Sequence, residues 1–260
     1  MIDTHCHLTF NGLRERLDEV LRDAASRGVH GAITVSTTTR SALDNLAIAN
    51  AHRNVWCTAG VHPLHSDEPI DWDTMIAVAN EPRCVAWGEL GLDHHYREPA
   101  RDLQLRVLRE QLTVIERSGV ERPVVVHCRD AFDALLPIFQ ASSLPPDRFV
   151  FHCFTGGPQE ARAVLDFGAW ISFTGIVTFR NAREIQEACR LVPDDRIMIE
   201  TDAPFLTPEP HRKIRPNEPQ YAWDTAQFVA RLRETDWNEF HDQINANARR
   251  FFGLPDHAAS

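Results

Sequence analysis

The sequence lacks several features, and each absence narrows the class of protein. No apolar run approaches the roughly 20 residues that a membrane-spanning helix needs. The chain enters Asp3 and His5 directly, without the basic and apolar regions of a secretory signal. Its six cysteines follow no framework spacing, which is typical of free thiols in a reducing compartment. We therefore expect a cytoplasmic protein with no membrane association and no obligate protein partner.

Basic residues are also too few to balance the acidic ones. The 27 Lys and Arg residues face 37 Asp and Glu residues, which gives a formal net charge of −10. This balance argues against a protein that holds nucleic acid by stoichiometric neutralisation of phosphates. It does not exclude an enzyme that meets phosphate through bound cations. The 43% apolar and 25% charged residues are those of a globular protein.

Short apolar segments alternate with amphipathic ones along the whole chain. Strands are predicted at residues 1–7, 31–35, 55–59, 84–88, 123–127, 149–152, 170–173 and 196–200. Helices are predicted at residues 13–27, 41–52, 73–80, 101–118, 132–140, 158–167, 182–191, 221–234 and 237–252. The strands lack polar alternation, as expected for a parallel sheet that is covered on both faces. Because no linker or repeat divides the chain, we predict a single-domain (β/α)8 TIM barrel over residues 1–260.

Ionisable residues at the predicted strand ends give the main functional signal. His5 and His7 are two residues apart on an extended segment, so both imidazoles lie on one face. The other residues of this kind are His62, Glu89, His127, His152, Glu200 and Asp202. In a (β/α)8 barrel the carboxyl ends of the strands open into one mouth, so these side chains are expected to meet there. Imidazoles and carboxylates gathered in this way indicate a metal site.

Two of these positions have alternative interpretations. His62 precedes Pro63, so it is either a ligand or substrate contact, or only a helix cap or a solvated ring. Glu200 shares a face with Asp202 and is expected to point inward, where an unpaired carboxylate is costly. We therefore expect Glu200 to hydrogen-bond a metal ligand.

Three cysteines, Cys6, Cys128 and Cys153, adjoin candidate ligand histidines. A zinc site with thiolate ligands is one interpretation. Strand alternation favours the other, because cysteines beside inward-facing histidines face the outer helices and pack there as small apolar residues. Nitrogen and oxygen ligands without thiolate suit Mg²⁺, Mn²⁺ or Zn²⁺, so the identity of the metal stays open.

Six motifs resemble those of the TatD family of metal-dependent deoxyribonucleases, which are amidohydrolase-like enzymes. They are Asp3-x-His5-x-His7-Leu8, Gly60-Val61-His62-Pro63, Gly88-Glu89-Leu90-Gly91-Leu92-Asp93, Val126-His127-Cys128-Arg129-Asp130-Ala131, Phe151-His152-Cys153-Phe154 and Ile199-Glu200-Thr201-Asp202-Ala203-Pro204. Residues 175–179 and the Pro-rich loop ending at Pro219 also match, so the resemblance covers essentially the whole chain. One departure concerns residues 212–219, where the loop is one residue longer than the family pattern and lacks its glycine. This departure affects the expected substrate contacts and leaves the metal ligands unchanged.

The resemblance implies a barrel with two divalent metal ions that hydrolyses phosphodiester bonds. One metal would bind His5, His7 and Asp202, and Glu89 would bridge to a second metal on His127 and His152. His62 and Arg129 would lie near the substrate phosphate or the metal shell. Asp202 would also act as the general base that takes a proton from the attacking water.

The resulting hypothesis is a 3′-to-5′ exonuclease acting on DNA or RNA. A hydrolase of small esters, lactones or amides is the alternative, because the same ligand set serves that chemistry. A barrel that binds without turnover is a third hypothesis, although no ligand position is lost. A nucleic acid needs a basic and aromatic track. The candidates, which are otherwise ordinary loop and cap residues, are Phe10, Arg129, Phe179, Arg180, Phe205, Arg212, Lys213 and Arg215.

Overall fold

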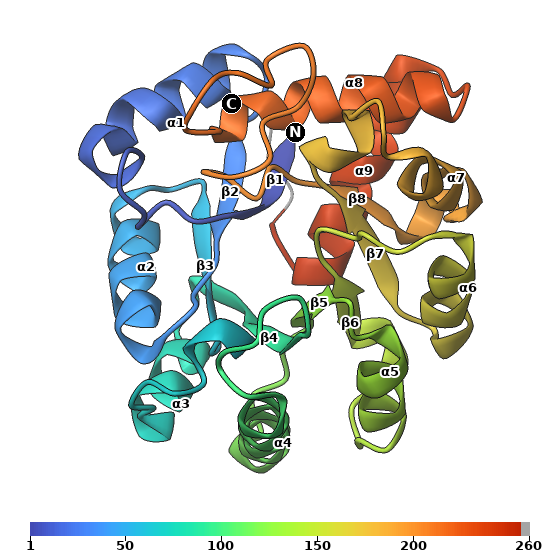
Figure 1. The fold of residues 1–260 in the computed structure, drawn as a ribbon. Coiled ribbons are helices and arrows are strands. Elements are labelled where there is room, and N and C mark those ends of the chain that lie inside the picture. Colours follow the sequence, from blue (N-terminus) through green and yellow to red (C-terminus); the bar gives the residue numbers. More distant parts are fainter. Residues whose placement is uncertain (256–260) are drawn as a thin grey trace.

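The computed structural model describes residues 1–255 and contains one sheet of eight parallel strands surrounded by helices (Figure 1). The strands are β1 (Ile2–Cys6), β2 (Gly31–Thr34), β3 (Val55–Ala59), β4 (Cys84–Asp93), β5 (Val124–Arg129), β6 (Phe149–Phe151), β7 (Trp170–Phe173) and β8 (Ile197–Ile199). Each strand pairs in parallel with the next one along the chain. An isolated bridge between Cys6 and Ala203 joins the first strand to the segment after the last. The predicted (β/α)8 barrel is confirmed, and it is nearly closed.

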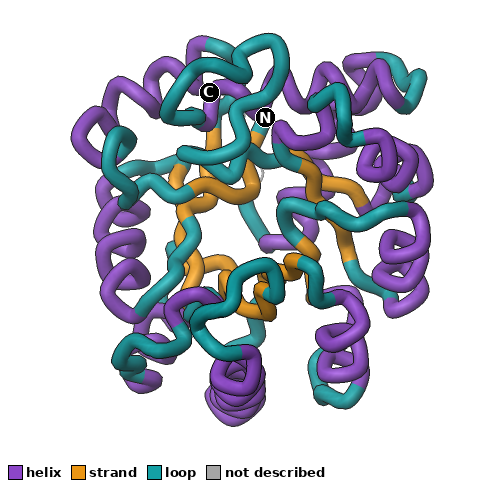
Figure 2. The backbone as a smooth tube through the Cα atoms, in the orientation of Figure 1, coloured by secondary structure: helices purple, strands orange, loops and turns teal. Residues whose placement is uncertain are grey.

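The helices lie around the strands, most of them in an outer ring (Figure 2). They are α1 (Leu17–Ser26), α2 (Thr39–Ala51), α3 (Trp72–Asn80), α4 (Arg101–Ser118), α5 (Phe132–Gln140), α6 (Pro158–Phe167), α7 (Arg183–Leu191), α8 (Ala222–Leu232) and α9 (Trp237–Phe252). Local sequence sets their ends. The Thr38 side chain caps α2 by accepting a hydrogen bond from the Ser41 backbone N–H, and α4 is followed by its C-terminal cap Gly119, whose φ is 67°. Within residues 1–255, the helices are all too short or too polar to cross a membrane.

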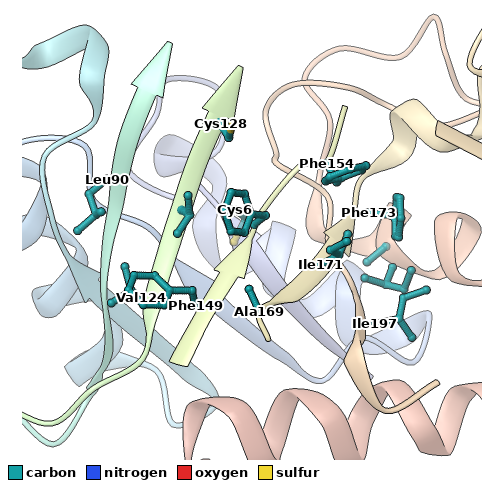
Figure 3. Close-up of a cluster of buried hydrophobic side chains, with 14 of the residues drawn as sticks. Cys6, Leu90, Val124, Cys128, Phe149, Phe154, Ala169, Ile171, Phe173 and Ile197 are labelled. Carbon is teal, nitrogen blue, oxygen red and sulfur yellow. The ribbon is translucent and has the colours of Figure 1, made fainter. Parts of the chain in front are cut away.

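Hydrophobic side chains cover both faces of the sheet. The larger layer lies between the strands and the outer helices and includes Phe149, Ile171 and Phe173 (Figure 3). The smaller layer fills the barrel interior and includes residues of α9. The ring of Phe251 in α9 lies 5.3 Å from that of Trp170, the first residue of β7. Helix α9 therefore covers the amino-terminal end of the barrel, and the polar strand ends gather at the opposite end.

Strand β4 is longer than predicted, because it continues past residue 88 to Asp93. Its pairing with β5 shifts register between Trp87 and Leu90, so the strand bulges at this point. Gly91 has a φ of 152°, and a Cβ atom there would lie 1.9 Å from the His127 carbonyl oxygen. Glycine is depleted in strands, which is why the sequence pattern ends this strand early. Here the close approach of β4 to β5 requires it.

Gly91→Ala should lower the free energy of unfolding, because the β5 backbone has to move to make room for the new Cβ atom. The loss should exceed the cost of adding a methylene group to a packed core, which is about 1–3 kcal/mol. Gly119→Ala is the matched control. Its new Cβ atom would meet no atom within 4 Å. Only the positive φ opposes that change, at about 1–2 kcal/mol. Urea denaturation of both variants measures the difference, and equal losses would show that β5 accommodates a side chain at position 91.

Candidate metal centre

A cavity of about 410 Å³ opens at the carboxyl ends of the strands. The histidines and carboxylates in its lining are His7, His62, His65, Glu89, Asp93, His127, His152 and Asp202. Aromatic and apolar residues of the surrounding loops complete the wall, and His5 lies fully buried beside it. The structure thus brings together the histidines and carboxylates that follow the predicted strands.

Four side-chain atoms from β1, the residue after it, β4 and the segment after β8 face one another. The Nε2 atom of His5 lies 3.3 Å from His7 Nε2, 3.3 Å from Glu89 Oε2 and 3.7 Å from Asp202 Oδ1. The Nε2 atom of His7 lies 3.3 Å from Asp202 Oδ1. The backbone fixes this arrangement, because the Asp202 N–H donates to the His5 carbonyl oxygen at 2.9 Å.

The other carboxylate oxygen of Glu89 faces a second group of atoms. Its Oε1 lies 2.8 Å from His127 Nδ1, 2.6 Å from His152 Nε2 and 3.5 Å from His62 Nε2. The Nε2 atom of His62 also lies 3.1 Å from His127 Nδ1. Glu89 therefore lies between two groups of potential ligand atoms, with one oxygen directed to each.

Burial and charge act in opposite directions on these residues. Burial disfavours the ionised form of Glu89, but His152, His62 and His5 hold the pKa of its carboxyl well below the usual range. Burial likewise disfavours protonated His152, yet Glu89 raises its pKa well above the usual value. Burial also opposes ionisation of Asp202, and the hydrogen bond with His7 nevertheless lowers its pKa. Both carboxyls are thus in the ionised form that binds cations.

Two of the histidines contact an acceptor through the ring nitrogen that points away from Glu89. The pairs are His7 Nδ1 with the Val35 carbonyl oxygen (3.2 Å) and His127 Nε2 with Asp93 Oδ2 (3.0 Å), whereas His152 Nδ1 lies 3.4 Å from Glu200 Oε1 without a hydrogen bond between them. An acceptor at this position holds the proton on the far nitrogen, so the near nitrogen keeps a lone pair for a metal.

Glu200 lies behind His152 and does not line the cavity. Its Oε1 accepts a hydrogen bond from the Cys153 backbone N–H at 2.6 Å, and its Oε2 accepts one from the Ser172 hydroxyl at 2.7 Å. These donors fix the carboxylate against the far side of the His152 ring. It therefore supports the ring and faces away from the cavity.

Asp93 is a site residue that the sequence pattern did not reveal. Besides its contact with His127, it accepts a hydrogen bond from the His95 backbone N–H at 3.0 Å. A signal was present, because Asp93 follows Glu89 by an even number of residues and even spacing places two side chains on one face of a strand. The predicted strand ended at residue 88, which hid this relation.

Asp3 lies behind the centre and has a structural role. Its Oδ1 accepts a hydrogen bond from the Thr201 backbone N–H at 2.9 Å, and its Oδ2 accepts one from the Thr201 hydroxyl at 2.6 Å. Asp3 therefore ties β1 to the segment that carries Asp202.

His62 begins the short 3-10 helix η2 (Pro63–His65). Its Nδ1 accepts a hydrogen bond from the Leu64 backbone N–H at 3.0 Å, while its Nε2 faces the second group of atoms. Burial and the neighbouring His127 hold its pKa well below the usual value. Both sequence interpretations apply in part, since His62 caps a helix and also lines the cavity.

The cysteines adopt two different positions. Cys6 and Cys128 belong to the outer hydrophobic layer, as Figure 3 shows, and the Cys6 thiol donates to the Ile33 carbonyl oxygen at 3.4 Å. Their predicted packing role is confirmed. Cys128 is also among the residues that line the cavity. Cys153, which is only partly buried, lines the cavity as well, with its Sγ 3.4 Å from Thr174 Oγ1. The prediction for Cys153 is wrong because β6 ends at Phe151, so strand alternation does not extend to residue 153.

Part of the predicted basic and aromatic track lies at the cavity. Phe10, Arg129 and Phe205 line it, and the ring centres of Phe10 and Phe205 lie 5.9 Å apart. Tyr96, which was not predicted, also lines the cavity, and the Arg129 guanidinium lies 5.3 Å from its ring centre. Aromatic rings from separate segments of the chain therefore line the same cavity as the histidines and carboxylates.

The remaining track residues do not line this cavity. The Arg212 guanidinium covers the Phe179 ring at 3.7 Å, and Arg215 donates to the Arg212 carbonyl oxygen at 2.8 Å. Arg180 and Lys213 are likewise absent from the lining. These candidates therefore do not belong to the cavity wall, because Arg212 packs on Phe179 and Arg215 bonds within its own loop.

Two observations test whether divalent cations fit this centre. Glu89 Oε2 is buried and has no hydrogen-bond partner, which is costly for an ionised oxygen unless a cation offsets it. Within residues 1–255, the groups of potential ligands whose atoms lie within 4.8 Å of one another contain no cysteine: His5-His7-Asp202, His62-Glu89-His127 and His5-His152-Glu200. Imidazole nitrogens and carboxylate oxygens form a donor set for divalent metals. The residues around Glu89 therefore fit a divalent cation.

Comparison with known proteins agrees with this geometry. The sequence profile of the family described as TatD related DNase matches residues 2–253. The "Uncharacterized metal-dependent hydrolase YcfH" of Escherichia coli K12 is 36% identical, over 98% of this chain and 96% of that protein. The "3′-5′ ssDNA/RNA exonuclease TatD" of Salmonella typhimurium is 34% identical, over 97% of this chain and 98% of that protein.

The similarity extends to three dimensions. The crystal structure of YJJV, a TatD homolog from Escherichia coli K12, matches with a TM-score of 0.92 at 27% identity. The match covers 98% of each chain. The whole barrel is therefore shared.

Cys6→Ala, Cys128→Ala and Cys153→Ala should each retain the metal content of the parent protein, because no thiol belongs to the groups that face Glu89. Cys6→Ala removes a fully buried sulfur and should lower the melting temperature more than Cys153→Ala, whose side chain is partly exposed. Metal analysis after loading with Mn²⁺, together with thermal unfolding, measures both effects. Loss of metal from Cys153→Ala would place a thiolate in the centre.

Proposed function

The chain belongs to the TatD-related DNase family of metal-dependent hydrolases, and we propose that it hydrolyses phosphodiester bonds of single-stranded DNA or RNA from the 3′ end. The observation that carries this proposal is the place of Glu89, which directs one oxygen to each of two ligand groups. A carboxylate shared in this way suits a pair of cations that act on one phosphodiester.

The proposed ligands divide between two cations. We assign His5, His7 and Asp202 to one and His127 and His152 to the other, with Glu89 shared between them. Bound divalent cations supply Lewis-acid stabilisation of charge on the phosphoryl oxygens and activate water near neutral pH. Mg²⁺, Mn²⁺ and Zn²⁺ all suit this donor set.

Asp202 is the proposed general base. Its side chain is 14% exposed, compared with 2% for Glu89, so it is the carboxylate of the centre that water reaches more readily. The hydrogen bond with His7 keeps it ionised and able to accept a proton. The water oxygen then attacks phosphorus, the bond to the leaving sugar oxygen breaks, and the leaving oxygen takes up a proton. No serine or cysteine nucleophile is needed.

The cavity wall supports a nucleic-acid substrate. The residues Phe205 and Tyr96 are 49% and 48% exposed, and both line the cavity, so their rings are available for stacking on unpaired bases. Arg129 lies beside Tyr96 and offers a cation for phosphate. A cavity of about 410 Å³ is within the range of small-ligand pockets, about 300–1,000 Å³, which supports cleavage at a strand end. The exonuclease name of the Salmonella relative supports the same substrate.

The protein loaded with Mn²⁺ should shorten 5′-labelled single-stranded DNA stepwise from the 3′ end. Glu89→Gln should reduce the rate by more than roughly 10²-fold. That factor is the upper end of the loss expected for a residue that only hydrogen-bonds a metal ligand, and Glu89 is proposed to bind the metal itself. Its melting temperature reports whether the fold is retained. A panel of phosphate esters, carboxylate esters and lactones is measured beside the DNA. Turnover confined to this panel would contradict the nuclease proposal and favour the hydrolase of small esters.

The general base can be separated from the ligands by a metal titration. Asp202→Asn keeps an oxygen near His7 but cannot accept a proton, so kcat should fall by roughly 10²–10⁴-fold and stay low in excess Mn²⁺. His7→Asn weakens mainly the binding of metal, so its kcat should recover in part as Mn²⁺ is raised. The measurement is kcat against Mn²⁺ concentration for both variants. Full rescue of Asp202→Asn would restrict Asp202 to a binding role.

A further inference from the structure

The mouth of the barrel offers few cationic side chains to a nucleic acid. Among the described residues that line the cavity, Arg129 is the only Lys or Arg, and its guanidinium lies 5.3 Å from the ring centre of Tyr96. Four of the eight loops that lead from a strand to the next helix contain no Lys or Arg, and they span residues 35–38, 60–71, 130–131 and 152–157. A nucleic-acid strand that left the cavity over these loops would find no side chain to neutralise its phosphates.

Several cations of the other loops are engaged within the fold. Arg16, in the loop after β1, lies 2.7 Å from the buried carboxylate of Glu218. In the loop after β8, the Arg212 guanidinium covers the Phe179 ring at 3.7 Å, and Arg215 donates to the Arg212 carbonyl oxygen at 2.8 Å. A guanidinium held in this way has to give up an existing contact before it can bind a phosphate.

Carboxylates occupy two sides of the mouth. A hollow that shares Thr155 with the cavity has four carboxylates and no Lys or Arg in its lining: Asp130, Asp133, Glu160 and Glu184. The loop after β3 adds Asp67, Glu68 and Asp71. We call these seven carboxylates the acidic rim. Phosphates that pass over it meet charge of the same sign, which costs free energy.

We propose that this enzyme is specific for short oligonucleotides, an inference that rests on the proposed phosphodiester hydrolysis. Tyr96, Phe205 and the proposed cations bind the nucleotides next to the scissile bond, whereas phosphates further along the strand meet the acidic rim. The attraction of the cations is screened beyond about 8 Å at physiological ionic strength, so it does not offset this repulsion. Cleavage of long strands by other nucleases is the class of reaction that supplies such a substrate.

Substrate length is the direct test. For the protein loaded with Mn²⁺, kcat/KM for removal of the 3′ nucleotide is measured on 5′-labelled oligothymidylates, from the dinucleotide upward. The value should reach its maximum at about three nucleotides, because phosphates further along have no cation to neutralise them. In KCl, the slope of log kcat/KM against log salt should be roughly −0.7 to −1.4, as for one or two phosphates of a single strand. A value that keeps rising with length, or a steeper slope, would overturn the proposal.

A double substitution tests the acidic rim itself. Asp133→Lys with Glu184→Lys places two cations in the hollow, where both residues are exposed. Long oligothymidylates should then gain kcat/KM relative to the trinucleotide, and the salt slope should steepen by roughly 0.7 for each phosphate that a new cation contacts. Glu81→Lys with Asp242→Lys is the matched control, because it makes the same change in net charge before β4 and on α9. No change in the first variant, or equal changes in both, would overturn the role of the acidic rim.

Failure of the proposed function gives a different result from failure of this inference. A parent protein that cleaves no oligonucleotide of any length but hydrolyses a carboxylate ester contradicts the phosphodiester proposal. Cleavage of long strands in preference to short ones leaves that proposal intact and overturns the specificity for short oligonucleotides alone.

Discussion

The buried, ionised carboxylate of Glu89 is the group on which the rest of the centre depends. It is 1% exposed, and a carboxylate withdrawn from water is costly unless hydrogen bonds or cations offset the loss of solvation. The barrel supplies this compensation with imidazoles that follow or end several strands, among them His5, His127 and His152. The same crowding keeps Glu89 ionised, and one of its oxygens is still without a hydrogen-bond partner. This combination makes the mouth of the barrel the candidate cation site.

The strands and the loops have different roles in the site. The strands fix the ligand atoms: the backbone N–H of Glu89 donates to the Ser36 carbonyl oxygen at 3.1 Å, and that of Asp202 donates to β1. The loops carry the residues that would meet a substrate, such as Phe205. The loop that departs from the family pattern is held by Asn217, whose Nδ2 donates to the Thr201 carbonyl oxygen at 3.0 Å. A longer loop can therefore change substrate contacts while the centre stays intact.

Much of the fold and the gathering of the site residues could be predicted from the sequence, because short apolar strands and residues at their carboxyl ends follow simple rules of barrel geometry. The rest depended on contacts between distant segments. After the bulge between Trp87 and Leu90, β4 runs on to Asp93, where Gly91 lets its backbone approach β5 closely; no local pattern reveals this approach. Cys153 turned into the cavity because its strand had already ended. His62 accepts a hydrogen bond from an amide in the following turn, which only the folded loop brings into place.

The most direct test of the central claim is anomalous diffraction at the manganese edge from crystals soaked in saturating Mn²⁺. Two peaks are predicted, one on each side of Glu89. The first should lie among His5, His7 and Asp202, and the second beside His127 and His152. A single peak, or a peak beside Glu200 behind the histidines, would contradict the role of Glu89 as the carboxylate shared by two cations.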